Sequence, residues 1–228
     1  MEKGQLNKKD WAKAFHYRIY LPPCYHRETN RRYPVLYLLH GQTYRDDQWD
    51  RLGIDEAANK LIAAGEIPPL LIVMPREEDT YSVPADNPFD EILIEGLIPY
   101  LDTTYRTRPE RAYRAIGGLS RGGNWALHLG LSHWELFASI GAHSTPTFVT
   151  DGPPKMRTWL AQIPAGEHPR IYLDSGRGDR WLESTLQFEQ VLTEEGIPHE
   201  WHLFSGYHNE DYWAAHVEDY LRWYTLEW

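Results

Sequence analysis

The chain has 228 residues, of which 42% are hydrophobic, and a formal net charge of −10. This length suits one domain with a sizeable core, and the composition is that of a folded protein rather than a disordered one. The acidic balance, without a block of lysine and arginine, argues against a nucleic-acid partner. The longest apolar runs, "VLYLL" and "PLLIVMP", are too short to span a bilayer.

The N-terminal stretch "MEKGQLNKKDW" is charged and lacks the apolar segment of a secretory signal. We therefore expect a cytoplasmic location for the chain as written, or a secreted one if a leader has been removed. Cys24 is the only cysteine, which excludes an internal disulfide. Nothing near Cys24 in the sequence would activate its thiol, so no catalytic role is expected for it. The sequence leaves the oligomeric state open.

Strand patterns and helix patterns alternate along the chain. The predicted strands are 15–21, 33–40, 69–75, 111–118, 137–144, 169–176 and 199–204. The predicted helices are 54–65, 87–105, 121–132, 180–195 and 209–224. Gly65 is a plausible stop for the first of these helices, and Asn87 followed by Pro88 is a typical start for the second.

Strands separated by helices predict an α/β fold with a mostly parallel central sheet and helices on both faces. Right-handed crossovers then place the active cleft at the carboxyl ends of the strands. We expect a single domain over residues 1–228. Only residues 145–168 offer room for a small lid or loop insertion.

A glycine-rich motif joins a predicted strand to a predicted helix. Residues 118–122, "GLSRG", match the pattern G-x-S-x-G. A serine on such a sharp turn has a strained backbone, and small neighbours let the strand and the helix approach. The turn exposes the hydroxyl at the sheet edge, which makes Ser120 the candidate nucleophile. An ordinary glycine-rich turn is the alternative interpretation.

The general base of this arrangement should be a histidine in a loop after a late strand. His208 follows the last predicted strand and precedes the last helix, and Gly206 permits a tight turn beside it. His143 ends the strand after the nucleophile helix and is the weaker choice as base, although it could line the cleft or make a structural hydrogen bond. No acid-bearing strand end precedes His143 in the required order. The other histidines considered lie in or just after the nucleophile helix (His128, His133), in the last strand (His199, His202) or within the last helix (His216).

The acid should come between the serine and the histidine in the chain. Asp174 and Asp179 both lie in "YLDSGRGDRWLE". Asp174 ends a strand, where it could cap a turn, whereas Asp179 lies in the loop beyond and could instead cap a helix. We favour Asp179 because a loop position lets it reach the imidazole Nδ1 of His208.

Two backbone N–H groups are needed to stabilise the oxyanion that forms during acyl transfer. The N–H of Arg121 is one candidate because it directly follows the nucleophile at a helix start. The N–H of Gln42, after the strand ending in "LLHG", is the other, with Thr43 as its substitute. His40 is expected to be a structural turn residue.

Pocket-lining side chains are expected in the loops 43–50, 76–90 and 143–168. The aromatic content, 10 tryptophans and 15 tyrosines, suits either a packed core or a cleft that stacks on sugar or phenolic rings. The candidate substrate-binding residues are Thr43, Trp49, Trp125, His143 and Trp181.

Taken together, "YPVLYLLHGQTYRDDQW", "RAIGGLSRGG", "LDSGRGDRWLE" and "GYHNEDYW" resemble the putative esterase family of α/β-hydrolases. That family includes feruloyl esterases, enterochelin esterase-like hydrolases, S-formylglutathione hydrolase and the antigen 85 mycolyltransferases. The resemblance runs from about residue 15 to 224. It implies a Ser120–His208–Asp179 triad with Gln42 and Arg121 as oxyanion donors.

We therefore expect a serine carboxylesterase that acts on a feruloyl, acetyl or other small carbohydrate-linked ester. A siderophore esterase, a thioesterase or an acyltransferase would use the same residues, and a catalytically inactive binding module is a further alternative. No cofactor is expected, and the histidines lack the spacing of a metal site.

Overall fold

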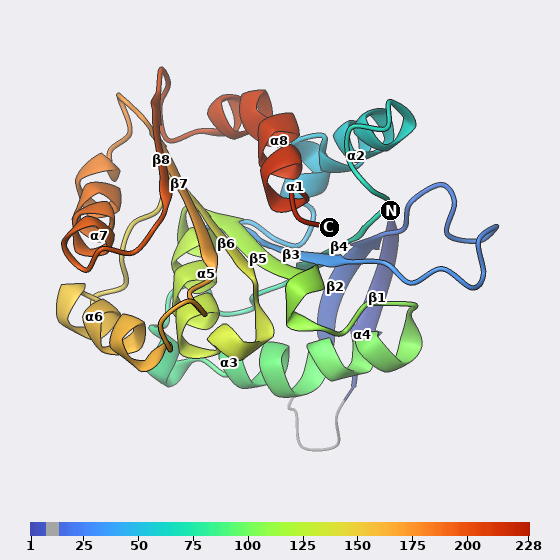
Figure 1. Ribbon diagram of the computed structural model, residues 1–228, viewed down its shortest axis with the longest axis horizontal. Coiled ribbons are helices and arrows are strands. Elements are labelled where there is room, and N and C mark those ends of the chain that lie inside the picture. The colour runs from blue at the N-terminus through green and yellow to red at the C-terminus, as the bar shows by residue number, and fades with distance from the viewer. Residues whose placement is uncertain (8–13) are drawn as a thin grey trace.

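The computed structural model describes residues 1–7 and 14–228 (Figure 1). One eight-stranded sheet forms its centre, in the order β1-β2-β4-β3-β5-β6-β7-β8. β1 and β2 are antiparallel to their neighbours, and the other strands are parallel. The strands are β1 (Glu2–Leu6), β2 (Phe15–Tyr20), β3 (Val35–Leu39), β4 (Leu71–Pro75), β5 (Arg114–Leu119), β6 (Ser139–His143), β7 (Arg170–Gly176) and β8 (Glu200–Phe204).

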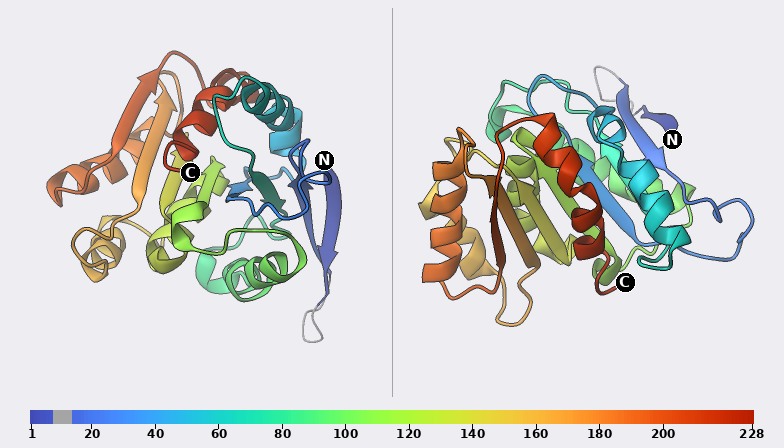
Figure 2. Two further views of the ribbon diagram at one scale, coloured as in Figure 1. Left: turned by 45° about the vertical axis from the view of Figure 1, so that its right-hand side comes forward. Right: turned by 90° about the horizontal axis from the view of Figure 1, so that it is seen from above.

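Helices cover both faces of this sheet, as the sequence predicts (Figure 1). They are α1 (Gln48–Arg51), α2 (Ile54–Ala63), α3 (Phe89–Glu91), α4 (Ile98–Thr104), α5 (Arg121–Ser132), α6 (Pro153–Gln162), α7 (Leu182–Glu194) and α8 (Glu210–Tyr224). A π-helical segment (Ile92–Leu97) joins α3 to α4, and short 3₁₀ turns occur at Pro84–Asp86, Arg111–Tyr113 and Trp134–Leu136. Seen from above, α8 and α2 lie side by side on one face (Figure 2).

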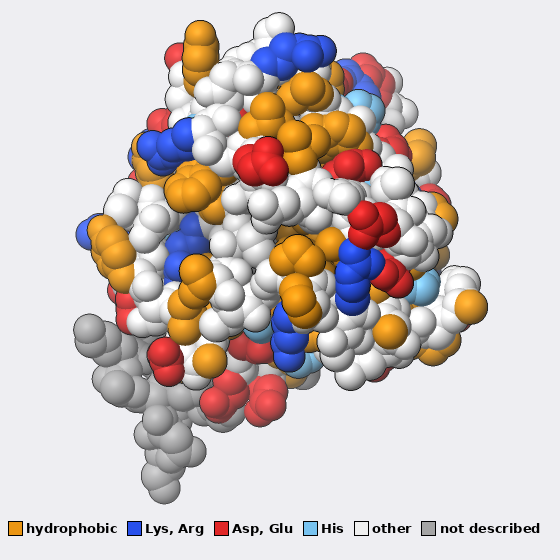
Figure 3. Space-filling view, turned by 90° about the vertical axis from the view of Figure 1, so that its left-hand side faces the viewer, with side chains coloured by type: hydrophobic (Ala, Val, Ile, Leu, Met, Phe, Trp, Pro, Cys, Tyr) orange, Lys and Arg blue, Asp and Glu red, His pale blue; other side chains and the backbone are white. Residues whose placement is uncertain are grey.

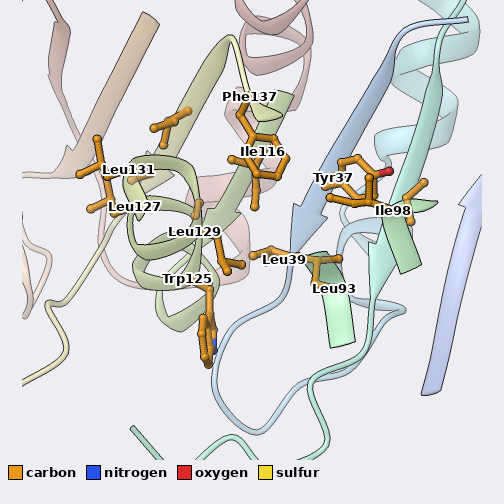
Figure 4. Packing of buried hydrophobic residues seen from close by; sticks show 14 of the residues in the cluster. Tyr37, Leu39, Leu93, Ile98, Ile116, Trp125, Leu127, Leu129, Leu131 and Phe137 are labelled. Carbon is orange, nitrogen blue, oxygen red and sulfur yellow. The ribbon is translucent and has the colours of Figure 1, made fainter. Parts of the chain in front are cut away.

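Two hydrophobic clusters, one on each face of the sheet, form the core. Alternate residues of β3 belong to different clusters: Tyr37 and Leu39 to the one with α3 to α7, Leu36 and Leu38 to the one with α1, α2 and α8. This follows from the strand repeat of two residues, and it explains why doubly covered strands are continuously apolar. Figure 4 shows side chains of α5, β3, β5 and α4 meeting in the first cluster.

The predicted helix over 87–105 forms as three segments rather than one. It begins at Phe89, whose N–H donates to Asn87 Oδ1 at 3.0 Å, and it widens to a π-helix before α4. Pro99 lies in the first turn of α4 and has no N–H to donate to the residue four positions before it. Local π-helical geometry is a common response to such an interruption.

Other predicted elements agree closely with the structure. The helix predicted over 121–132 has the same bounds as α5, and Gly65 follows α2 with a φ of 71°. β1 was not predicted, because "EKGQL" is short, largely exposed and without apolar alternation. The strand predicted over 111–118 begins only at Arg114, after a 3₁₀ turn.

Residues 145–168 contain α6, which packs against α5 and α7. Met156, Trp159 and Leu160 are the buried residues of this helix.

On the face shown in Figure 3, acidic and basic side chains are interspersed with small apolar groups. In the part of the chain that the structure describes, no helix is both long and apolar enough to cross a bilayer.

Candidate active site

Ser120 occupies a strained turn between β5 and α5. Its φ of 52° and ψ of −123° lie outside the common regions for a residue with a side chain, at a typical cost of about 1–3 kcal/mol. Its N–H donates to the carbonyl of His143 at 2.8 Å. A Cβ on Gly118 would lie 2.3 Å from the backbone of Gly122, and one on Gly122 would lie 2.1 Å from the carbonyl oxygen of Leu39. The close approach of strand and helix therefore requires both glycines.

The structure brings Ser120, His208 and Asp179 together. His208 Nε2 lies 2.9 Å from Ser120 Oγ, and His208 Nδ1 lies 3.1 Å from both carboxylate oxygens of Asp179. A nitrogen that faces a carboxylate carries the proton, so Nε2 accepts the serine hydroxyl hydrogen. The loops after β7 and β8 touch, with the N–H of Gly178 donating to the carbonyl of Gly206 at 2.9 Å. This contact holds the acid near the imidazole.

Asp179 is kept ionised in a buried position. Its carboxylate also accepts the N–H of Trp181 at 2.7 Å. Burial alone would raise the pKa of Asp179, but the hydrogen bonds from His208 and Trp181 outweigh that effect and hold the pKa below its ordinary value. The edge of Trp213 packs on the His208 ring, with centroids 5.0 Å apart. The imidazole is thus fixed by both a charge partner and an aromatic neighbour.

Asp174, the alternative acid, belongs to a different, fully buried group. Its carboxylate lies 2.6 Å from His143 Nδ1 and accepts the hydroxyls of Tyr212 at 2.5 Å and Tyr220 at 2.9 Å. Burial and the nearby carboxylate raise the pKa of both tyrosines, so their hydroxyls stay protonated and donate. His143 Nε2 lies 3.0 Å from the hydroxyl of Tyr224. Asp174 is therefore engaged away from His208.

A pocket of about 680 Å³ opens above Ser120. Six of the predicted site residues line it: Gln42, Thr43, Ser120, Arg121, Trp181 and His208. Trp181 is 41% exposed and Tyr44, another lining residue, is 40% exposed. This size falls within the range of pockets for small ligands.

Three predicted substrate-binding residues do not line this pocket, which corrects that expectation. Trp49 is 1% exposed and its indole N–H donates to the carbonyl of Leu39, while Trp125 is 1% exposed and donates to Glu77. His143 is fully buried in the Asp174 group. Each points from its element into the core rather than toward the strand ends, a direction that a sequence pattern does not reveal.

Other lining residues were not singled out in the sequence, although Gln48 and Phe148 lie in the loops 43–50 and 143–168, where pocket residues were expected. They include Gln48, Asn124, Phe148, Arg180 and Glu210. Asn124 had a usable signal, because a residue four positions after the serine on the same helix lies one turn above it. Phe148 comes from the segment after β6, of which Pro146 and Phe148 reach the pocket.

The two predicted oxyanion donors line the pocket. Within residues 1–7 and 14–228, neither the N–H of Gln42 nor that of Arg121 has a hydrogen-bond acceptor in the protein. The N–H of Gly41, by contrast, donates to Gln48 Oε1 at 2.8 Å. His40 accepts the N–H of Glu77, and burial lowers its pKa to about 4, as suits a neutral structural histidine.

Among the described residues, no group of three or more histidine, cysteine, aspartate or glutamate side chains is placed to hold a metal ion. The chemistry available at the pocket is that of a serine, an imidazole and a buried carboxylate in series. This series and the α/β architecture together define a serine hydrolase class of site.

Comparison with known proteins gives the family. The family model described as Putative esterase matches residues 11–224, and the chain belongs to this family. It is 27% identical over 242 residues to Esterase Rv1288 of Mycobacterium tuberculosis. The matched region covers 83% of this chain and 51% of that protein. The chain thus spans about half the length of this curated relative.

Two further similarities concern feruloyl esterases. An endo-1,4-beta-xylanase/feruloyl esterase of Xylanibacter ruminicola is 31% identical over 148 residues, covering 58% of this chain and 20% of that protein. A solved structure named ferulic acid esterase superposes with a TM-score of 0.87 at 23% identity, covering 100% of this chain and 98% of that one. The latter similarity establishes the α/β-hydrolase fold.

Proposed function

We propose that Ser120, His208 and Asp179 form a catalytic triad that hydrolyses an ester through a covalent acyl-enzyme. The observation that carries this proposal is the 2.9 Å contact of His208 Nε2 with Ser120 Oγ, combined with the Asp179 carboxylate on the opposite ring nitrogen. Serine is weakly nucleophilic at its ordinary pKa and needs such an adjacent base. Ser120 and His208 line the pocket, where an ester can reach them, while Asp179 is buried behind the imidazole.

In acylation, His208 Nε2 takes the proton from Ser120 Oγ as the oxygen attacks the ester carbonyl carbon. Asp179 stabilises the imidazolium and keeps Nδ1 protonated. The tetrahedral intermediate collapses, the C–O bond to the alcohol breaks, and the imidazolium returns the proton to the leaving oxygen. A water activated by His208 then attacks the acyl-serine, which releases the acid and restores Ser120.

The N–H groups of Gln42 and Arg121 are proposed to stabilise the oxyanion. Among the residues that the structure describes, neither N–H group has a protein acceptor, and that of Arg121 is at the start of α5, where the helix dipole favours negative charge. Loss of one such donor typically lowers the rate by about 100–1000-fold.

The substrate is proposed to be a small feruloyl, acetyl or other carbohydrate-linked ester. The half-exposed rings of Trp181 and Tyr44 at the pocket support this assignment, since flat aromatic faces stack on sugar and phenolic rings. The partial similarity to a xylanase/feruloyl esterase points the same way.

The test is hydrolysis of p-nitrophenyl acetate, methyl ferulate and an acetylated sugar by the wild type and by Ser120→Ala. We expect wild-type turnover of at least one ester and loss of that activity in the variant, because the nucleophile is gone. Activity that survives in Ser120→Ala would contradict the mechanism. Activity on p-nitrophenyl acetate alone would contradict the substrate class.

A further inference from the structure

We infer that the loop 77–82 is a brace that sets the spacing between the two oxyanion donors, with Arg121, Glu77 and Thr80 as its positioning residues. The inference rests on the proposed function, because it concerns the N–H groups of Gln42 and Arg121. It adds a role that the triad and its donors do not require: the loop after β4 ties the start of α5 to the end of β3.

One end of the brace is the Arg121 side chain. Its guanidinium binds Glu77 through two bonds, Nε to Oε2 at 2.8 Å and Nη2 to Oε1 at 2.6 Å. Nη2 also donates to the carbonyl of Ser82 at 2.6 Å. The residue whose backbone N–H faces the oxyanion therefore holds two points of the loop 77–82 with its side chain.

Glu77 fixes that end in the core. It is 4% exposed, and its Oε1 also accepts the indole N–H of Trp125 and the amide of Asn87, both at 2.8 Å. Its N–H donates to His40 Nε2 at 3.0 Å, one residue before Gly41. A buried carboxylate with a forked arginine partner and two further donors has its direction over-determined.

The other end of the brace is Thr80, which is 7% exposed. Its carbonyl accepts Gln42 Nε2 at 3.1 Å, and its Oγ1 accepts the N–H of Thr43 at 3.4 Å. Thr43 has a φ of 67°, which is unusual for a β-branched residue and persists only where the surroundings hold it. Thr80 contacts both residues that flank the Gln42–Thr43 peptide and so holds this strained turn.

The two donors follow different strands of the sheet, Gln42 after β3 and Arg121 after β5, and these two strands pair side by side up to Leu39 and Gly118. An oxyanion hole works only if its donors are preorganised within a fraction of an ångström of the developing charge. One short loop contacts both donor segments. We therefore expect that removing one of these contacts weakens the stabilisation of the oxyanion in the transition state and leaves substrate binding in the ground state unchanged.

The test is Thr80→Val, which removes the Oγ1 acceptor and preserves the side-chain shape and the Arg121–Glu77 pair. With p-nitrophenyl acetate, we expect kcat to fall about tenfold, which is less than the ~100–1000-fold for a lost donor. The inhibition constant of a trifluoromethyl ketone, whose adduct with Ser120 carries an oxyanion, should rise by a similar factor. KM and the pH profile should not change.

Two further variants serve as controls, and a third tests the other end of the brace. Thr80→Ser keeps the acceptor and should recover most of kcat. Tyr81→Phe alters the adjacent residue, which is 76% exposed, and should behave as the wild type. Glu77→Gln weakens the other end and should lower kcat and raise the inhibition constant together, with a lower melting temperature.

The outcomes separate the brace from the mechanism on which it rests. If Ser120→Ala retains activity, the proposed function itself fails. If Ser120→Ala is inactive but Thr80→Val leaves kcat and the inhibition constant unchanged, the brace is wrong. A rise in KM with no change in the inhibition constant would also overturn it, since that pattern belongs to a residue that binds substrate in the ground state.

Discussion

Two aspartates each lie beside a histidine, and exchanging each for asparagine should give opposite results. In Asp179→Asn the side chain keeps one oxygen for the Trp181 N–H, but it no longer offers a charge to His208 Nδ1. The tautomer of His208 with a proton on Nδ1 is then no longer favoured, and the imidazolium formed during the reaction is no longer stabilised. We therefore expect kcat to fall by about 10⁴-fold. The melting temperature should change little.

Asp174→Asn perturbs only the buried group. The remaining oxygen can still accept the two tyrosine hydroxyls, but the new amide replaces the acceptor that lies 2.6 Å from His143 Nδ1. Loss of one hydrogen bond to a charged group costs about 1.5–3 kcal/mol. At about 2–4 °C per kcal/mol for a chain of this size, the melting temperature should fall by about 3–12 °C.

The assay is steady-state hydrolysis of p-nitrophenyl acetate, corrected for the folded fraction, together with thermal unfolding. Asp174→Asn should retain kcat within about threefold of the wild type, since no proposed catalytic contact is removed. The reasoning would be refuted if Asp174→Asn lost activity to the extent expected for Asp179→Asn while its melting temperature stayed unchanged.

Two further predictions concern packing and pH. Gly122→Ala would place a Cβ 2.1 Å from the carbonyl oxygen at the end of β3, so the free energy of unfolding should fall by about 1–3 kcal/mol or more. Gly152→Ala is the control, because its Cβ would meet nothing nearer than 3.9 Å. Thermal unfolding should show no change for this control. Burial alone would lower the pKa of His128, but the carboxylates of Asp151 and Asp90, at 2.8 and 3.6 Å from its ring nitrogens, outweigh burial and raise the pKa. Protonated His128 therefore stabilises the fold at pH values below its unfolded pKa, and this stability is lost as pH rises through the folded pKa. His128→Gln should destabilise the protein more at pH 6 than at pH 9 in urea unfolding; equal losses at both pH values would contradict this assignment.

The sequence predicted the regular part of the fold well because burial imposes periodicity there. α5 was placed to the residue, and the central strands to within two or three residues. β1 escaped prediction since an exposed edge strand needs no apolar alternation. The π-helical segment at 92–97 was missed because its apolar spacing resembles that of an α-helix, and only the demand of Pro99 on the preceding turn distinguishes it.

The meeting of Ser120, His208 and Asp179 could be predicted from chain order, because loops after parallel strands meet at one edge of the sheet. The choice of Asp179 over Asp174 agrees with the observed contacts of His208. Pocket-lining tryptophans were harder, since Trp49 and Trp125 are buried and the sequence alone does not show which way a side chain points. The Arg121–Glu77 pair was also missed, because a glutamate after a strand gives no sign that it is buried.

The segment after β6 has a consequence for how such enzymes diversify. β6 lies between β5 and β7 in the sheet, yet its loop carries none of the proposed catalytic side chains. It contributes Pro146 and Phe148 to the pocket wall instead. The segment after β6 therefore shapes the pocket without supplying a proposed catalytic group, so exchanging it is expected to change which ester fits while the Ser120–His208 contact stays as it is.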